Sequence, residues 1–225
     1  QDEYGEVDVV KINIPIFIIG ESREHCIVIG GLQMNGWEGS DVHVSDLTLR
    51  QSKDIGVEGR MYGGASIHLD NVSIENSGQC GVVVYGKRNT MKNCNVSHSK
   101  SNGLVVSGDD GLMTIDGDAT TIHHNCISGC SCEISSCYVH VRFGMHVYTN
   151  SSIHLLSPLT KDMITKNNGG GGNYGGAGTI KTITSNELDC NENRSKIKTQ
   201  EGMIQELENY LETGFLCSLI MRRPT

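Results

Sequence analysis

The chain has 225 residues and a formal net charge of −8, because 26 acidic side chains outnumber 18 basic ones. This balance disfavours a nucleic-acid partner, since binding to phosphates requires a basic face. No apolar run approaches the roughly 18 residues that a membrane-spanning helix needs. With 28 glycines and only 5% aromatic residues, the composition suits short strands and tight turns better than a helical bundle.

We predict that the first 19 residues form an N-terminal edge strand or cap. An alternating apolar segment runs from Val10 to Ile19 and is suited to a first, partial coil of a repeat structure. The chain opens with Gln1 rather than Met, which indicates that the true N-terminus is cleaved or absent. Nine cysteines leave at least one unpaired, so the cellular compartment and the disulfide state stay open.

A repeat of 22 to 25 residues follows, and it decides the fold. Val42–Leu49 aligns with Ile67–Ile74 at an offset of 25, and Met91–His98 continues at an offset of 24. Met113 lies 22 residues after Met91. Later copies are residues 112–115, 121–126 and 152–155.

Each period holds three strand-like pieces of three to five residues, separated by Asn, Asp and Gly turn signals. Such a strand buries its inner side only by stacking on its equivalent one coil away, about 4.8 Å off. The expected inward columns are Val42/Ile67/Met91/Met113, Leu47/Val72/Val96/Ile122 and Val57/Val82/Leu104. The linkers are too short for crossover helices. We therefore predict an all-β, right-handed parallel β-helix over residues 20–185.

The C-terminal residues 186–225 predict a tail with a short capping α-helix. Thr199 is an N-cap candidate, and Gly214 is a candidate for the glycine that ends the helix. The apolar residues that share one face of this helix are Met203, Ile204, Leu207, Tyr210 and Leu211.

Just before the tail, the glycine-rich run Asn167–Gly178 predicts a linker or exposed loop, because it lacks the Lys-Ser/Thr ending of a phosphate-binding loop.

Several segments carry a resemblance to a known group: Ile16–Ser22, Thr114–Gly117, Thr121–Cys126 and Thr179–Ile183, together with the repeats. Over about residues 10–185 the chain resembles right-handed parallel β-helix domain proteins of the pectate-lyase-like superfold that are numerous in marine microalgae. This group has no assigned activity. The wider superfold includes enzymes acting on acidic polysaccharides as well as non-catalytic adhesins and scaffolds, so the resemblance implies a fold and leaves the activity undecided.

The densest acidic cluster is Asp109, Asp110, Asp116 and Asp118. Carboxylate pairs serve hydrolases of the superfold, and carboxylates hold Ca²⁺ in its lyases. Ser107–Gly111 is faintly similar to the Gly-Asp-Asp segment of polygalacturonases, but the other signatures of those enzymes are missing. We therefore assign no catalytic residue. Asp109 and Asp110 suit a turn, where an aspartate side chain hydrogen-bonds to nearby backbone groups.

A second cluster combines histidines and cysteines: His123, His124, Cys126, Cys130, Cys132, Cys137 and His140. Imidazoles and thiolates suit Zn²⁺, but the spacing of these cysteines matches no zinc motif. Adjacent side chains on a strand also point to opposite faces. Buried filler or disulfides fit better, so we predict neither a metal site nor a cofactor.

His43 and His68 occupy equivalent outward positions one coil apart, and the alignment places Lys92 and then Thr114 next in the same column. Stacked imidazolium ions would repel, so we expect this histidine pair to be mostly neutral at pH 7. A plain solvated sheet face explains the pattern, yet His43, His68 and Lys92 form the best candidate binding surface.

The leading hypothesis is a non-enzymatic β-helix scaffold or binding module that presents a long sheet face to a protein or glycan partner. The first alternative is a lyase or hydrolase acting on acidic polysaccharide through Asp109, Asp110 or Asp116. The second is a structural subunit of a larger assembly, docked through the apolar tail Phe215–Met221.

Overall fold

The computed structural model describes residues 9–37, 40–59, 65–126, 142–184 and 186–187. Its described strands form parallel sheets wound into a β-solenoid, which confirms the predicted all-β parallel fold. The first 182 residues make one compact unit, and residues 183–225 make a second. The predicted capping helix and the tail Phe215–Met221 lie outside the described residues.

Two sheets form the walls of the solenoid. Sheet A contains, in spatial order, β1 (Val9–Ile12), β4 (Gly31–Met34), β6 (Val57–Gly59), β8 (Val82–Val84), β11 (Leu104–Val106), β14 (Met145–Val147) and β17 (Tyr174–Gly176). Sheet B contains β2 (Ile16–Ile19), β3 (Ile27–Ile29), β5 (Asp41–Arg50), β7 (Ser66–Glu75), β9 (Asn89–Lys92), β10 (Asn95–Ser97), β12 (Leu112–Asp116), β13 (Thr121–His123), β15 (Ser152–Leu156), β16 (Thr165–Lys166) and β18 (Thr179–Ile183).

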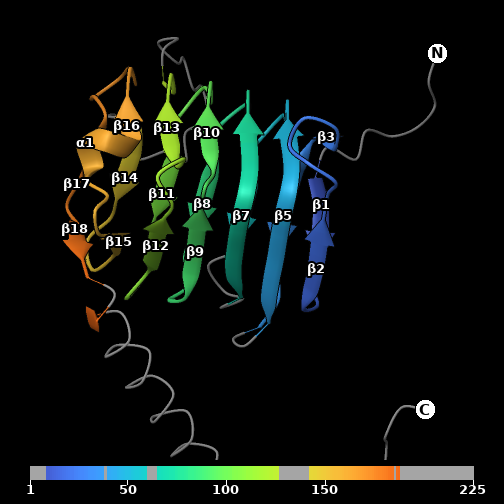
Figure 1. Ribbon diagram of the computed structural model, residues 1–225, viewed down its shortest axis with the longest axis horizontal. Coiled ribbons are helices and arrows are strands. Elements are labelled where there is room, and N and C mark those ends of the chain that lie inside the picture. Colours follow the sequence, from blue (N-terminus) through green and yellow to red (C-terminus); the bar gives the residue numbers. More distant parts are fainter. Residues whose placement is uncertain (1–8, 38–39, 60–64, 127–141, 185, 188–225) are drawn as a thin grey trace, which may run out of the picture. The chain divides into compact units, whose positions relative to one another are not determined.

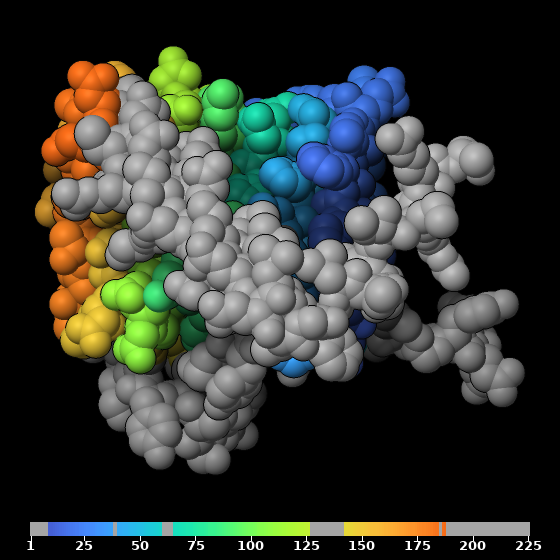
Figure 2. Space-filling view, turned by 90° about the horizontal axis from the view of Figure 1, so that it is seen from below, coloured from blue at the N-terminus to red at the C-terminus, as the bar shows by residue number. Residues whose placement is uncertain are grey.

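Each coil crosses sheet A once and sheet B in two successive segments. Figure 1 shows the strands of successive coils side by side in chain order, and Figure 2 shows the same order as neighbouring bands of colour. The two longest strands, β5 and β7, pair in parallel from Asp41 with Ser66 to Arg50 with Glu75. The inward apolar residues of the coils form one continuous core.

The bends between the strand segments use residues with positive φ. Within sheet B, Asp46, Asn71 and Asn93 have φ values of 55°, 53° and 50° in successive coils. Asn and Asp tolerate this left-handed conformation better than other non-glycine residues. The turn signals of the sequence are therefore the corners of the solenoid. A second set of corner residues, at the far end of sheet B, is Gln51, Asn76, His98, His124 and Asn167.

The residue after each of these second corners is small and polar. These residues are Ser52, Ser77, Ser99, Asn125 and Asn168. Asn125 is fully buried, and both ends of its side-chain amide are hydrogen-bonded. Its Oδ1 accepts the Ser99 N–H at 2.9 Å, and its Nδ2 donates to the Val96 carbonyl and to Asn168 Oδ1, both at 3.0 Å. In this inner corner column the asparagines join adjacent coils, and Asn168 Nδ2 likewise donates to the Ile122 carbonyl at 2.9 Å.

The predicted inward columns are right in part. The pairings Val42–Ile67 and Leu47–Val72 are confirmed. However, Met91 pairs with Leu69 rather than Ile67. The position beside Ile67 belongs to the buried Asn89, whose Oδ1 accepts the Ile67 N–H at 3.0 Å. The alignment matched apolar residues only, so it passed over an asparagine in the core.

The same two-residue shift affects the second column. Val96 pairs with Ile74 rather than Val72, although its pairing with Ile122 is confirmed. Met113 pairs with Asn89. In sheet A, where the strands are short, the predicted column of Val57, Val82 and Leu104 is confirmed.

The glycine-rich run is only partly a loop. Its segment Tyr174–Gly176 is strand β17, which pairs with β14. A Cβ at Gly175 would collide with the Phe143 ring, so a larger residue in this strand would require that ring to move. One unpredicted helical turn, α1 (Lys161–Ile164), connects β15 to β16.

Candidate functional site

The outer sides of the two sheets differ in exposure. In sheet A, the outward residues Val83, Val105 and His146 retain only 5%, 7% and 8% of their accessible surface. In sheet B, Phe17 is 69% exposed, and the residues in register with it are half-buried or exposed. Sheet B therefore offers the open face. Its central outward column is Phe17, His43, His68, Thr90, Thr114 and His154.

Three aromatic rings stack at the N-terminal end of this column. The centroids of Phe17 and His43 are 4.4 Å apart with planes at 8°, and those of His43 and His68 are 4.5 Å apart at 17°. The stacking follows from strand spacing, because in-register side chains of parallel strands lie about 4.8 Å apart. The next ring is replaced by a hydroxyl, and Thr90 Oγ1 lies 2.9 Å from His68 Nδ1.

The electrostatics keep the His68 imidazole neutral at pH 7. Its pKa is lowered first by burial and then by the neighbouring His43, while Asp41 acts in the opposite direction. Both lowering effects penalise the charged form of the ring. The structure therefore supports the predicted neutral state of His68.

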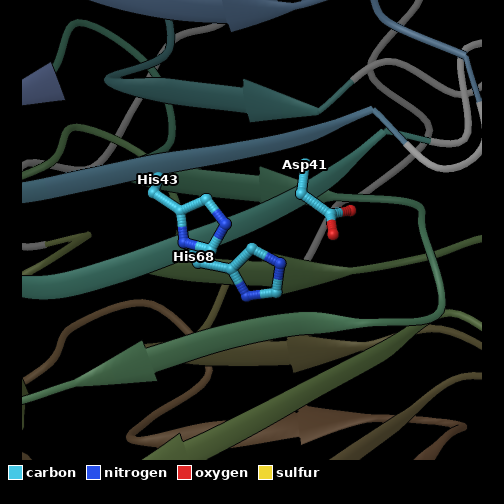
Figure 3. Close-up of side chains that lie close together, drawn as sticks. All are labelled: Asp41, His43 and His68. Atoms are coloured by element: carbon cyan, nitrogen blue, oxygen red, sulfur yellow. The ribbon is translucent and has the colours of Figure 1, made fainter. Parts of the chain in front are cut away.

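Asp41 completes a cluster with the two histidines. It lies two residues before His43 on β5, so both side chains leave the same face of the strand. One ligand-type atom from each of Asp41, His43 and His68 lies within 4.8 Å of the others. Figure 3 shows the Asp41 carboxylate beside the two stacked rings, and one ring nitrogen of each histidine lies on the side nearer this carboxylate. Arg88 also reaches this carboxylate, at 2.8 Å.

Lys92 does not belong to this column. It pairs with Asp70 in one direction and with Asp116 in the other, two residues along the strands from the histidines. The placement of Lys92 next to His68 was wrong for the same reason as that of Met91, since the coil offset here is 22 rather than 24. Thr114 does lie in the histidine column, as the alignment placed it.

A second feature of sheet B is an open pocket of about 300 Å³ over β3, β5 and β7. It is lined by Arg23, Glu24, Ile27, Thr48, Arg50, Ser73 and Glu75. The sequence pattern did not predict this group. Only the alignment of Arg50 with Glu75, at an offset of 25, could have signalled it.

Both carboxylates of this pocket, Glu75 and Glu24, already accept hydrogen bonds from neighbouring groups of the protein. Arg50 binds Glu75 Oε2 through Nε at 3.0 Å and through its terminal nitrogen at 2.9 Å, and Ser73 donates to Oε1 at 2.8 Å. The pKa of Glu24 is lowered by a hydrogen bond from its own backbone and by one from Ser22. Glu24 is therefore ionised at neutral pH and has no proton to give as a general acid.

A family model described as "Right handed beta helix region" matches residues 30–191. The chain belongs to the right-handed β-helix family. Neither the curated proteins nor the solved structures contain a match. In the described part of the chain, no helix has the length and apolar character to cross a membrane.

A second histidine group of this β-helix lies at the far corner of sheet B. The rings of His98 and His124 stack at 5.4 Å, and the Nδ1 atoms of His123 and His124 are 2.7 Å apart. The pKa of His123 is lowered by burial and then by His124 and His98. The lowered pKa keeps the His123 imidazole neutral at pH 7.

Cys126 behaves as the predicted buried filler. Its thiol is free and donates to the Ser101 carbonyl, and burial raises its pKa to about 12. Such a thiol carries almost no thiolate, the form that binds metals. The remaining members of the predicted cluster, Cys130, Cys132, Cys137 and His140, lie outside the described residues.

The three catalytic candidates of the acidic cluster, Asp109, Asp110 and Asp116, do not converge. Asp109 and Asp110 form the exposed turn before β12, as predicted, and Asp110 pairs with Lys87 at 3.2 Å. Asp116 ends β12, where its Oδ1 accepts the N–H of Gly117 at 2.7 Å. The turn and Asp116 therefore lie at opposite ends of the five-residue strand β12, which is about 17 Å long.

Proposed function

We propose that this β-helix is a non-enzymatic binding module that holds a glycan on the outer face of β2, β5 and β7. The observation that carries the proposal is the stack of Phe17, His43 and His68 on the open face of sheet B. Aromatic rings with polar groups beside them suit sugars, which present apolar C–H surfaces and hydroxyls together.

The charges of this face favour a neutral glycan over an acidic one. Asp41 and Arg88 form an ion pair and offset one another. His68 is held neutral by its surroundings. Hydroxyl groups of Thr90 and Thr114 continue the column along the solenoid. The face therefore offers hydrogen bonds without a strong field of either sign.

The test is a binding assay on immobilised neutral and acidic polysaccharides, run in chelator. The full chain should bind one or more neutral polysaccharides, and the double substitution His43→Ala/His68→Ala should abolish that binding. His25→Ala is the matched control, because His25 is an exposed histidine outside the column. Equal binding by the double variant and the wild type would refute the proposal.

The pocket beside this face favours a second candidate, an enzyme acting on acidic polysaccharide. Arg23 and Arg50 would bind the sugar carboxylates, and Glu75 would act near the scissile bond. An assay for newly formed reducing ends or unsaturated products on pectin and alginate tests this role. Activity lost in Arg50→Ala and Glu75→Gln, but kept in Lys87→Ala, would replace the binding module with an enzyme. Activity lost in Asp109→Asn or Asp110→Asn would assign it to the turn instead.

A further inference from the structure

We propose that Asp41, His43 and His68 form a binding site for a divalent transition-metal ion of the Zn²⁺ type. This inference goes beyond the glycan-binding role and does not depend on it. Two imidazoles and one carboxylate are ligands that Zn²⁺ uses at sites with an open coordination position.

The fold brings the three ligands together from two adjacent coils. Asp41 and His43 leave the same face of β5 because they are two residues apart. His68 reaches that face from β7, where it is in register with His43. The ligands are thus fixed by two ten-residue strands that pair in parallel, rather than by a loop.

The distances are those of a nearly assembled site. One ligand atom from each residue lies within 4.8 Å of the other two. In a tetrahedral zinc site, bonds of about 2.0 Å place neighbouring ligand atoms about 3.3 Å apart. Closing this difference requires rotation of the two stacked rings about their Cβ–Cγ bonds, because an imidazole binds metal in its own plane. That torsion is broad and soft.

A supporting hydrogen bond orients one ligand. Thr90 Oγ1 lies 2.9 Å from His68 Nδ1. When Nδ1 donates its proton to this hydroxyl, Nε2 keeps its lone pair, and Nε2 becomes the metal ligand. Outer partners of this kind fix the tautomer and orientation of metal-binding histidines.

Arg88 modulates the site rather than blocking it. Its terminal nitrogen binds Asp41 Oδ1 at 2.8 Å, and the Arg88 side chain is 51% exposed. A carboxylate has two oxygens and can hold an arginine on one while it binds a cation through the other. The guanidinium also positions Asp41 toward the histidines.

The experiment is a calorimetric titration of the tag-free, metal-stripped full chain with Zn²⁺, repeated with Co²⁺ and followed by absorption. We expect one Zn²⁺ whose binding weakens about 100-fold or more in His43→Ala, in His68→Ala and in Asp41→Asn. Thr90→Val should weaken it about tenfold, since outer-shell changes cost roughly 10- to 100-fold. His25→Ala should bind as the wild type does.

Two results would overturn the proposal. One is wild-type affinity and stoichiometry in the His43→Ala and His68→Ala variants, with their folding verified by circular dichroism. The other is a sulfur-to-cobalt charge-transfer band in the near ultraviolet, which would place the ion on cysteines. No glycan is present in this titration and chelator is present in the glycan assay, so each proposal can fail without the other.

Discussion

Two columns of polar side chains run along sheet B, one inside its far corner and one on its outer face, and they differ in how their hydrogen-bonding groups are used. Inside, Asn125 is fully buried and bonds backbone groups of the coil before it. Outside, His43 and His68 are half-buried and contact each other through ring faces. Asparagine amides that are fully hydrogen-bonded within the protein stabilise the coils, whereas outward ring nitrogens that are not all used in this way can bind a ligand.

The largest expected effect comes from the inner column. Asn125→Ala should lower the free energy of unfolding by about 2 kcal/mol or more, because it leaves the buried Ser99 N–H unpaired and removes the amide hydrogen bonds to Val96 and Asn168. Urea denaturation measures this change. The matched control is Asn95→Ala on the outer face, which should cost less than about 1 kcal/mol. Equal losses in both variants would remove the distinction between the columns.

Acidification should act on His123 at the far corner of sheet B. The pKa of His123 is lowered in the folded protein by burial and by His124 and His98, with Lys166 acting in the same direction and Glu75 opposing. The unfolded chain, with an ordinary pKa of about 6.5, then binds the proton more readily. Stability is therefore fully present above about pH 6.5 and falls as the pH drops from there through the lowered pKa.

Thermal unfolding at about pH 7.5 and about pH 5.5 measures that fall. His123→Gln should show a smaller decrease than the wild type, and the exposed His25→Gln should show the same decrease as the wild type. An undiminished fall in His123→Gln would mean that other groups cause the acid sensitivity.

The outer histidines should matter little for stability. His43→Ala/His68→Ala removes two ring stacks on an open face, so we expect a loss of about 1 kcal/mol in unfolding free energy. Urea denaturation in chelator gives this value without any contribution from bound metal. A loss as large as that of Asn125→Ala would show that the outer column is structural.

The smallest effect is expected at the acidic turn. Lys87→Ala breaks the exposed ion pair with Asp110, whose side chains are 63% and 78% exposed. Such pairs contribute about 0–0.5 kcal/mol because water and salt screen them. A melting temperature within error of the wild type is the expected result, and a large decrease would give this turn a structural role.

The fold and part of the candidate site could be predicted from the repeat alone. The offset of 25 residues between β5 and β7 correctly placed His68 beside His43, because no insertion separates the two coils. The predicted offset of 24 residues between β7 and β9 was wrong by two, because the true offset is 22. Asn89 occupies an inward position there that the apolar pattern does not mark. That error put Lys92 in the histidine column and left out Thr90.

The sequence by itself determined that the chain is a parallel β-helix, because apolar alternation at a fixed period and turn residues between the pieces are local properties. The tertiary structure decided which side chains share a face. Asp41 and Arg88 are 47 residues apart, and Glu24 and Glu75 come from different coils. Their meeting depends on coil length and corner geometry, which a buried asparagine or a two-residue shift alters without disturbing the hydrophobic pattern.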